Sequence, residues 1–414
     1  MAAEFFIHNL GCKVNRVESD TICAQLLAAG GKLASRDAAG VIVINSCTVT
    51  AEADTKVRKA IRQAHDAAKK PWVIVTGCAV AINRQIYKQF GDRVIIEPDR
   101  VAAQQKALEL LGILSSDATP DQVLIRCSSE FRTRLGVKIQ DGCNNSCTYC
   151  VVPAARGEAR SEPAQSVLNQ VQIAEKHGVG EIVLTGVNLG AYTSDDTDIA
   201  EVIRLLLAST ERLRIRLSSL EPQYLTDELL ELMAASEGRL CAHVHLPLQS
   251  GCDKTLQEMF RHYDCEFFEA RVNKARNLLP HIAITTDVMV AFPGESDSDF
   301  AESLDFCRRM KFSHMHIFRY SRRPGTTAAT RKDQISPAIS KARAETMREL
   351  AYTMEQRDLK LRVGTTEAVL VESDTKGRSE SYHQVLIPDK VKKGSLISMK
   401  FTDYRDNLLT GLIL

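Results

Sequence analysis

The most informative stretch of the sequence is Gly142-Cys-Asn-Asn-Ser-Cys-Thr-Tyr-Cys150, which places Cys143, Cys147 and Cys150 in one short loop. Three thiolates this close together can converge on one metal centre, and iron–sulfur clusters are held by cysteine thiolates, usually four for a cubane. A set of three would leave one iron without a protein ligand and free to bind a small molecule. The alternatives are a zinc site, which in its structural form needs four closed ligands, and three unrelated thiols.

The composition is that of an ordinary globular protein. The chain has 414 residues, of which 44% are hydrophobic and 25% charged, and a formal net charge of +1. It is long enough for two or three domains, and any nucleic acid surface must be a local patch. The first residues do not resemble a signal peptide, and no apolar run approaches the ~18 residues of a membrane span. We therefore expect no membrane association and a cytoplasmic location, where the 12 cysteines indicate metal binding or catalysis rather than disulfides.

Three further cysteines each follow a predicted strand in residues 1–112. The predicted strands are Phe5–His8, Val41–Ile44 and Trp72–Val75, and the cysteines after them are Cys12, Cys47 and Cys78. Continuous β-branched runs are typical of buried parallel strands, with helices expected at Glu18–Ala29 and Ala53–Ala68. Ligands bind at the carboxyl edge of such open sheets, where three crossovers could bring these cysteines to one point. Buried structural thiols and a zinc site are the alternatives.

The middle of the chain alternates strands and helices after a predicted linker at Ile113–Asp121. The candidate strands are Leu135–Gln140, Glu181–Thr185, Arg214–Leu217, His243–Leu246, Ala283–Met289 and His314–Phe318. Helices are expected between them, for example at Pro163–Lys176, Ile199–Ala208, Thr226–Ser236 and Glu266–Leu279. This pattern predicts a partial (β/α)6 barrel over residues 129–350, with its chemistry in the loops that follow the strands.

The last part of the chain changes character. Ser336-Pro337 reads as an N-cap followed by proline at the first helical position, and the helix should run to about Arg362. Residues 356–414 then contain short β-rich runs separated by Gly and charged turns, which predicts a small β-barrel. These runs are Glu367–Val371, Gln384–Ile387, Leu396–Phe401 and Leu408–Leu414. The predicted fold class is therefore α/β, with an open parallel sheet, a partial barrel and a small β-barrel in order.

Several motifs together resemble the radical S-adenosylmethionine (SAM) methylthiotransferase family. The cysteine loop, with Tyr149 before its last cysteine, resembles the radical SAM superfamily. The N-terminal motifs are Gly11-Cys12-Lys-Val-Asn15, Asn45-Ser-Cys47-Thr-Val-Thr50 and Thr76-Gly-Cys78. Later motifs are Leu184-Thr-Gly-Val-Asn-Leu-Gly190, Leu217-Ser-Ser-Leu-Glu-Pro222, Leu246-Pro-Leu-Gln-Ser-Gly251 and Asp287-Val-Met-Val-Ala-Phe-Pro-Gly-Glu295. The C-terminal barrel resembles the TRAM domain, so the resemblance covers nearly the whole chain.

The resemblance implies an enzyme with two [4Fe–4S] clusters and SAM. Cys143, Cys147 and Cys150 would be the catalytic set, holding the cluster that cleaves SAM to a radical. Cys12, Cys47 and Cys78 would hold a second cluster that carries the sulfur. The radical would abstract hydrogen from adenine C2, and an external one-electron donor such as a flavodoxin or ferredoxin would be required.

Within the family, the motifs look most like the branch that modifies threonylcarbamoyladenosine 37 in the tRNA anticodon stem-loop. The same-family alternatives act on isopentenyladenosine 37 of tRNA or on an aspartate of a ribosomal protein. Alternatives of another class are a non-catalytic iron–sulfur RNA-binding sensor and a zinc-stabilised RNA-binding protein.

The expected SAM contacts are less strongly marked in the sequence. The superfamily often has a Gly-Gly-Glu-like motif after the second strand, where this chain has Thr185-Gly-Val-Asn188 without a Glu. The candidate cofactor-binding residues are Tyr149, Gly186, Glu221, Gln249 and Asp287. Arg156 and Arg160 could face substrate or SAM, or form a solvated basic face. Candidate RNA contacts are Arg58, Lys59, Arg62, Arg319, Arg322, Arg323, Lys390, Lys392, Lys393 and Lys400, with Tyr320 and Tyr382 for stacking.

Overall fold

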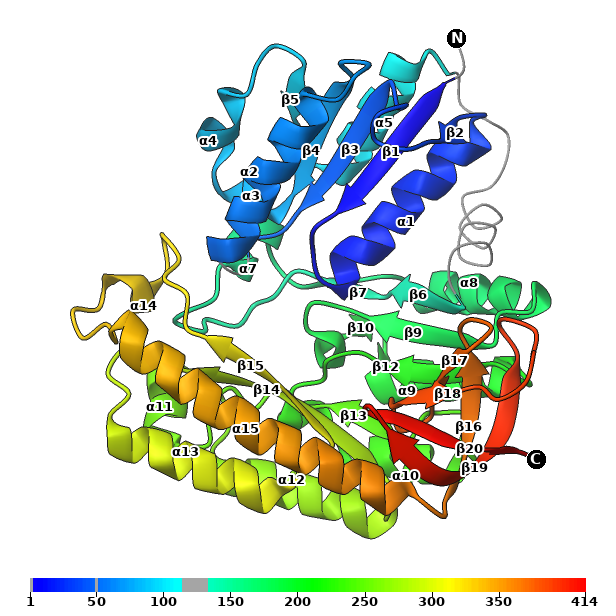
Figure 1. Cartoon of the computed structure of the whole chain (residues 1–414), viewed down its shortest axis with the longest axis vertical. Coiled ribbons are helices and arrows are strands. Elements are labelled where there is room, and N and C mark those ends of the chain that lie inside the picture. Colours follow the sequence, from blue (N-terminus) through cyan, green and yellow to red (C-terminus); the bar gives the residue numbers. More distant parts are fainter. Residues whose placement is uncertain (1–2, 49–50, 114–132) are drawn as a thin grey trace.

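The computed structural model describes residues 3–48, 51–113 and 133–414 (Figure 1). An N-terminal parallel sheet stands above a larger body of parallel strands and helices, and a closed β-barrel lies against that body. This arrangement confirms the predicted fold class. The expected linker Ile113–Asp121 lies outside the described residues from position 114 onward. Among the described helices, none has the length and apolar character of a membrane span.

The N-terminal sheet has the strand order β2-β1-β3-β4-β5, with all neighbours parallel. The strands are β1 (Glu4–Asn9), β2 (Lys32–Leu33), β3 (Val41–Ser46), β4 (Trp72–Gly77) and β5 (Val94–Ile96). The helices are α1 (Lys13–Ala28), α2 (Ala51–His65), α3 (Cys78–Ile82), α4 (Arg84–Lys88) and α5 (Arg100–Leu111). In β3, Val41 and Val43 pack with α1 and α5, while Ile42 and Ile44 pack with α2. The strand is therefore buried on both faces, as its continuous apolar run requires.

The prediction that the first helix begins at Glu18 was wrong. Helix α1 begins at Lys13, directly after Cys12. The apolar periodicity missed the first turn because that turn buries a polar residue, Asn15, whose Nδ2 donates to Asn45 Oδ1 at 3.0 Å. This bond fixes the start of α1 against the carboxyl end of β3.

The central body contains two three-stranded parallel sheets in residues 134–319. Their orders are β6-β9-β12 and β13-β14-β15, and a parallel bridge between Ser219 and His245 joins them. The strands are β6 (Arg134–Lys138), β9 (Glu181–Thr185), β12 (Arg214–Leu217), β13 (His243–His245), β14 (Ala283–Val290) and β15 (His314–Arg319). Their positions agree with the candidate strands within two residues at each end, and the βα order is that of the predicted partial barrel.

Helices surround these strands and share one large apolar core with them. The longer helices are α8 (Ala164–Lys176), α9 (Ile199–Ser209), α10 (Asp227–Ala235), α12 (Cys265–Leu278), α13 (Asp297–Met310) and α15 (Pro337–Arg362). Shorter elements are α7 (Val152–Arg156), α11 (Asp253–Glu258), α14 (Thr327–Thr330), the 3-10 turns Leu189–Ala191 and Pro222–Tyr224, and the strand pairs β7 (Gln140–Asp141) with β8 (Arg160–Ser161) and β10 (Thr193–Ser194) with β11 (Thr197–Asp198). Ser336 caps α15 as predicted, since its side chain accepts from the Ile339 N–H.

The C-terminal residues form a closed barrel in the order β16-β17-β18-β20-β19. Its strands are β16 (Thr366–Val371), β17 (Lys376–Ser379), β18 (Gln384–Leu386), β19 (Leu396–Arg405) and β20 (Leu408–Ile413). The small β-barrel prediction is confirmed, although β17 was missed because its sequence, Lys-Gly-Arg-Ser, has no apolar residue. Gly377 in β17 lies where a Cβ would come within 2.8 Å of the Leu370 carbonyl oxygen, so the close strand approach requires glycine.

A buried charge cluster attaches this barrel to the central strands. Glu181 is fully buried and pairs with Arg214 at 2.5 Å and with Arg216 at 2.8 Å. Arg214 also donates to the Ala368 carbonyl oxygen at 2.7 Å, and Arg216 to that of Glu380 at 2.9 Å. Burial alone would raise the pKa of Glu181, but the two arginines lower it to about 2. The barrel carbonyls thus accept hydrogen bonds from two guanidinium groups that share the Glu181 carboxylate.

Replacement of Glu181 by Gln is expected to lower the free energy of unfolding by about 3–5 kcal/mol, because it leaves two buried guanidinium groups without a carboxylate. Urea unfolding followed by circular dichroism measures the change. Glu201→Gln, which removes an exposed partner of Arg204, is the matched control and should shift the midpoint little. Equal midpoints for the two variants would contradict this role of Glu181.

Candidate active site

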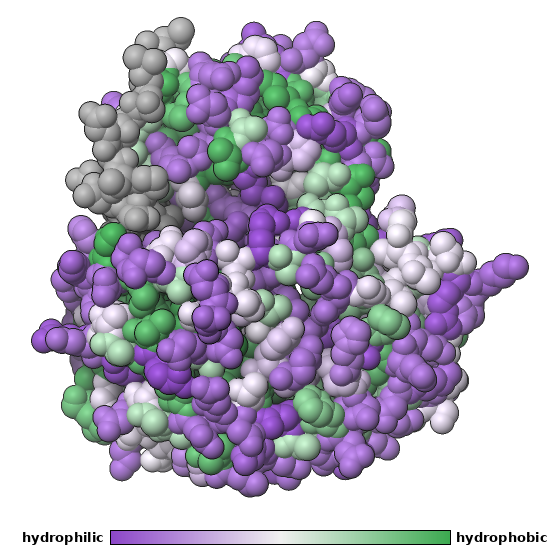
Figure 2. All heavy atoms as spheres, turned by 180° about the vertical axis from the view of Figure 1, so that it is seen from behind, coloured by the Kyte–Doolittle hydropathy of each residue, from purple (hydrophilic) through white to green (hydrophobic). Residues whose placement is uncertain are grey.

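Cys12, Cys47 and Cys78, here called the edge cysteines, lie together at the carboxyl edge of the N-terminal sheet. Cys12 precedes α1, Cys47 follows β3 directly, and Cys78 is the first residue of α3 after β4. All three line one cavity of about 790 Å³ between the N-terminal sheet, the central strands and the barrel. From behind, hydrophilic side chains line the hollow between the upper and lower parts of the molecule (Figure 2).

Hydrogen bonds hold this edge in place. The Cys12 thiol donates to Asn15 Oδ1 at 3.2 Å, and Arg100 reaches Cys78 Sγ at 3.7 Å. Gly77 has a φ of +95°, and a Cβ there would lie 2.5 Å from both Asn45 Oδ1 and the Ser46 carbonyl oxygen. Only glycine fits this turn from β4 into α3. The positions of the edge cysteines are therefore fixed by the backbone turn at Gly77 and by the side chains of Asn15, Asn45 and Arg100 next to them.

Cys143, Cys147 and Cys150, here called the loop cysteines, lie between β7 and α7. Each sulfur accepts one hydrogen bond: from the Asn145 N–H to Cys143 at 3.4 Å, from Arg261 to Cys147 at 3.1 Å, and from the Val152 N–H to Cys150 at 3.4 Å. The short β7–β8 pair and a bond from the Cys143 N–H to the Gly157 carbonyl oxygen close the loop at its base. Such donors stabilise sulfur in its thiolate form.

Two of the loop thiols, Cys143 and Cys150, are favoured in their neutral form. Burial raises the pKa of Cys143, and burial with the neighbouring thiols raises the pKa of Cys150 to about 12. Without a metal these thiols keep their protons at neutral pH, whereas metal ligands must be deprotonated. Among the described residues, no three His, Cys, Asp or Glu side chains stand close enough to hold a single metal ion. A cubane offers a separate iron to each thiolate, so both cysteine sets fit a cluster better than a lone zinc ion.

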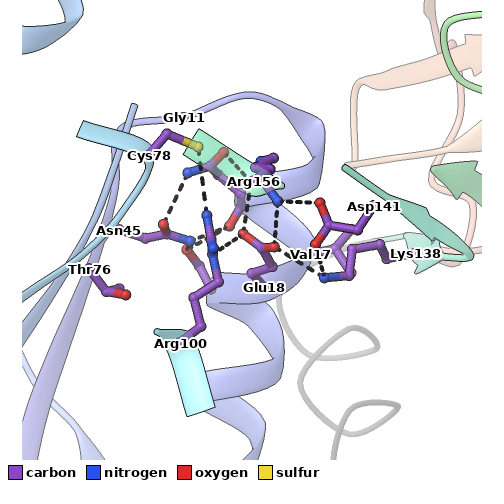
Figure 3. A network of polar contacts seen from close by, with 12 residues as sticks. Gly11, Val17, Glu18, Asn45, Thr76, Cys78, Arg100, Lys138, Asp141 and Arg156 are labelled. Carbon is purple, nitrogen blue, oxygen red and sulfur yellow. Dashed lines mark hydrogen bonds and ion pairs between the residues drawn. The ribbon is translucent and has the colours of Figure 1, made fainter. Parts of the chain in front are cut away.

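Arg156 contacts residues that neighbour both cysteine sets, and Figure 3 shows its polar contacts beside Cys78. Its guanidinium lies between Glu18 Oε1, at 2.9 Å, and Asp141 Oδ1, at 2.8 Å, and it also donates to Asn15 Oδ1 at 3.0 Å. The side chain is 2% exposed, so the suggestion of a solvated face for Arg156 was wrong, while the residue does line the large cavity. The charges of Arg156 and Lys138 hold the pKa of the buried Asp141 carboxyl well below its usual range. Arg160 pairs with the same carboxylate at 2.8 Å.

The five candidate SAM contacts fall in different places. Glu221 lies beside the loop cysteines, since its carboxylate accepts from Asn145 at 2.9 Å and from Arg261 at 2.5 Å. Gly186 lines the large cavity, and a Cβ there would lie 2.9 Å from Gln140 Cβ. Tyr149 packs edge-on to Phe292.

The remaining two candidates belong to neighbouring strand ends. Gln249, with a φ of +68°, exchanges backbone hydrogen bonds with β14 at Asp287 and Met289. The Asp287 carboxylate lies 3.3 Å from His245 Nε2, and His245 lines the cavity. Arg261, which contacts both Cys147 and Glu221, was missed because nothing in its local sequence marks it.

One candidate RNA contact was wrong, since Arg323 is buried and pairs with Asp54 at 2.7 Å. Tyr320 is half-buried, with its ring centroid 5.7 Å from that of Phe292. The candidate RNA contacts that are exposed on the surface include Lys59 and Arg62 on α2 and Lys390, Lys392, Lys393 and Lys400 on the barrel.

Tyr382 of the barrel lines the cavity and is surrounded by cations. Those within 5.5 Å of its ring centroid are Lys13, Arg134, Arg216 and Arg378. Burial alone would raise the pKa of Tyr382, but the charges of Lys13 and Arg134 lower it to about 8. Its phenol therefore ionises well before an ordinary tyrosine.

The apo-protein labelled with ¹³C at tyrosine Cζ should show one resonance that titrates near pH 8 and disappears in Tyr382→Phe. Because the pKa in the folded state lies below the ordinary 10.0, ionisation stabilises the fold. That contribution is complete above pH 10 and is lost as the pH falls through about 8. Replacement of Lys13 by Met should raise this pKa. A titration in which all tyrosines ionise together near pH 10 would contradict the assignment.

Comparison with family models gives two matches in the chain. Residues 137–307 match the radical SAM superfamily, and residues 4–96 match a family described as uncharacterized protein family UPF0004. The first match contains the loop cysteines, and the second contains the edge cysteines. Among solved structures, the radical SAM methyltransferase TsrM from Kitasatospora setae superposes with a TM-score of 0.57 over 80% of this chain and 77% of that one. The identity is 13%, so this likeness shows the fold alone.

Curated relatives cover most of the chain. The threonylcarbamoyladenosine tRNA methylthiotransferase MtaB of Thermotoga maritima is 34% identical over 88% of this chain and 86% of its own length. The MtaB of Bacillus subtilis is 35% identical over 81% of this chain and 77% of its own length. A tRNA-2-methylthio-N(6)-dimethylallyladenosine synthase of Endomicrobium trichonymphae is 30% identical over 90% of each chain. The chain therefore belongs to the radical SAM methylthiotransferase family.

Proposed function

We propose that this protein is a tRNA methylthiotransferase that converts N6-threonylcarbamoyladenosine 37 to its 2-methylthio derivative. The observation that carries the proposal is the presence of two cysteine sets linked through the contacts of Arg156, in a chain that MtaB relatives match over most of its length. The proposed domains are residues 1–112, 129–350 and 356–414, which carry the edge cysteines, the loop cysteines and the barrel respectively.

The cysteines are the proposed ligands of two [4Fe–4S] clusters. Cys143, Cys147 and Cys150 would hold one cluster, with SAM at its open iron, and Cys12, Cys47 and Cys78 would hold the other. When bound, these groups supply the radical and the sulfur chemistry. A soluble one-electron donor of the flavodoxin or ferredoxin type would reduce the protein in the cytoplasm.

The chain itself positions these groups and the substrate. Arg261 holds Cys147 and Glu221 together at one side of the loop, and Arg156 sets the distance between the loop and the edge. The cavity beside the edge cysteines accommodates a base and its N6 substituent, since its volume is about 790 Å³. Exposed lysines of the barrel, among them Lys390 and Lys392, would hold the phosphates of the anticodon stem-loop.

Nucleoside mass spectrometry of tRNA tests this function. In a strain that lacks the modification, the wild-type chain should restore 2-methylthio-threonylcarbamoyladenosine, and Cys12→Ala and Cys143→Ala should not. Cys265→Ala is the matched control, because Cys265 is a half-buried thiol at the start of α12, and it should restore the modification.

The product also separates the alternatives. Formation of the 2-methylthio form of dimethylallyladenosine instead would favour the other tRNA branch. An unchanged nucleoside profile with the wild-type chain would defeat the proposal.

A further inference from the structure

The wall of the cavity beside Cys12 contains buried polar atoms that make no hydrogen bond with the described residues. Ser218 and His243 both line it and are 3% and 2% exposed. Among the hydrogen bonds of the described residues, Ser218 Oγ and His243 Nδ1 have no partner. Buried polar atoms without partners cost about 1–3 kcal/mol each, so an unfilled wall of this kind is unusual unless a ligand completes it.

One of the four cations around Tyr382 has no carboxylate partner among the described residues. Three of the four cations around Tyr382 have carboxylate partners, in the pairs Arg134–Glu372 (2.9 Å), Arg378–Glu372 (3.8 Å) and Arg216–Glu181 (2.8 Å). Within residues 3–48, 51–113 and 133–414, no ion pair joins Lys13 to a carboxylate, and its Nζ lies 5.5 Å from the Tyr382 ring centroid. Lys13 follows Cys12 directly and is exposed to the cavity.

His243, which lies beside Tyr382 in the wall, does not add a second positive charge. Burial lowers the pKa of His243 well below its ordinary value, and the charges of Arg216 and Lys13 lower it further. His243 is therefore neutral and stacks on Tyr382, with ring centroids 4.8 Å apart. Lys13, Tyr382 and His243 thus form a contiguous surface that offers the Lys13 ammonium group and a free ring nitrogen of His243.

The chemistry of the substituent on N6 of adenine matches this surface in only one of the two tRNA substrates. A threonylcarbamoyl group carries a carboxylate, a hydroxyl group and a urea-type carbonyl, whereas a dimethylallyl group is hydrocarbon. The hydrocarbon would leave Lys13, Ser218 and His243 without partners in the cavity. Sites with buried polar groups reject substrates that lack the matching groups much more strongly than apolar sites reject a surplus group.

We propose that Lys13 binds the carboxylate of the threonylcarbamoyl group, with Ser218 and His243 binding its other polar atoms, and that this subsite selects the substrate. The inference rests on the proposed function and names the residues that make the enzyme specific for threonylcarbamoyladenosine. Lys13 is well placed for this role because Cys12, its neighbour, lies at the site of sulfur transfer.

Two synthetic anticodon stem-loops test the subsite: one with threonylcarbamoyladenosine, and one in which the threonine carboxylate is replaced by a neutral amide. Binding is measured by fluorescence anisotropy and turnover by KM and kcat, with anaerobically loaded enzyme. Wild type should bind the carboxylate RNA at least about tenfold more tightly than the amide RNA, as expected for a charge-assisted hydrogen bond. Lys13→Met should lose this preference through a higher Kd and KM for the carboxylate RNA only, and Lys13→Arg should retain most of it.

Lys341→Met, which removes an exposed charge on α15, is the matched control and should keep the wild-type preference. Equal affinity of the wild type for the two RNAs would overturn the inference. An equal loss of affinity for both RNAs in Lys13→Met would also overturn it. If the wild type methylthiolates neither RNA, the proposed function itself fails and the inference falls with it. If it methylthiolates both equally well, the function stands and the inference alone fails.

Discussion

The buried ion pair between Arg156 and Glu18 is the contact on which the arrangement of the two cysteine sets depends. Glu18 belongs to α1, which begins beside Cys12, and Arg156 ends α7, which begins two residues after Cys150. Asp141 and Asn15 complete the coordination of the guanidinium, and α7 also packs against α3, which begins at Cys78. Removal of one partner of such a buried pair typically costs about 3–5 kcal/mol. The N-terminal sheet is thereby fixed to the loop that carries the other three thiols.

This ion pair explains how the N-terminal sheet and the central body, which have separate apolar cores, can form one site together. The apolar clusters of the N-terminal sheet and of the central body are distinct, so packing alone would allow the two parts to shift. The polar contacts of Arg156 and Arg323 cross between them. The barrel is fixed in the same way through Arg214 and Arg216, which brings Tyr382 to the wall of the cavity. Each of these contacts uses an arginine fork that satisfies several acceptors at once.

The elements that the sequence predicted well are those with a strong local signal. Val41–Ile44 and Trp72–Val75 are continuous apolar runs that predict buried parallel strands, and the two strands do pair in parallel. A cysteine that follows such a strand lies at the carboxyl edge of the sheet. The barrel was predicted from four of its strands, while Lys376–Ser379 gave no apolar signal.

The contacts that could not be predicted join residues far apart in the chain. Arg261 lies 114 positions after Cys147, and Arg323 lies 269 positions after Asp54. A single arginine reads as a surface charge until its partner is known. Lys13 likewise differs from the three arginines around Tyr382 only through partners far away in the chain, since each arginine has a carboxylate within 3.8 Å and Lys13, among the described residues, has none.

The central claim is that each cysteine set holds its own cluster and that both clusters lie close to one cavity. Iron analysis and electron paramagnetic resonance of anaerobically reconstituted, reduced protein test it most directly. Two triple variants are needed, one with the edge cysteines and one with the loop cysteines changed to Ala. Each should bind half the iron of the wild type, and the broadening of the wild-type signal by coupling between two clusters should vanish in both. A triple variant that keeps all the iron, or a wild type that carries zinc without iron, would contradict the account.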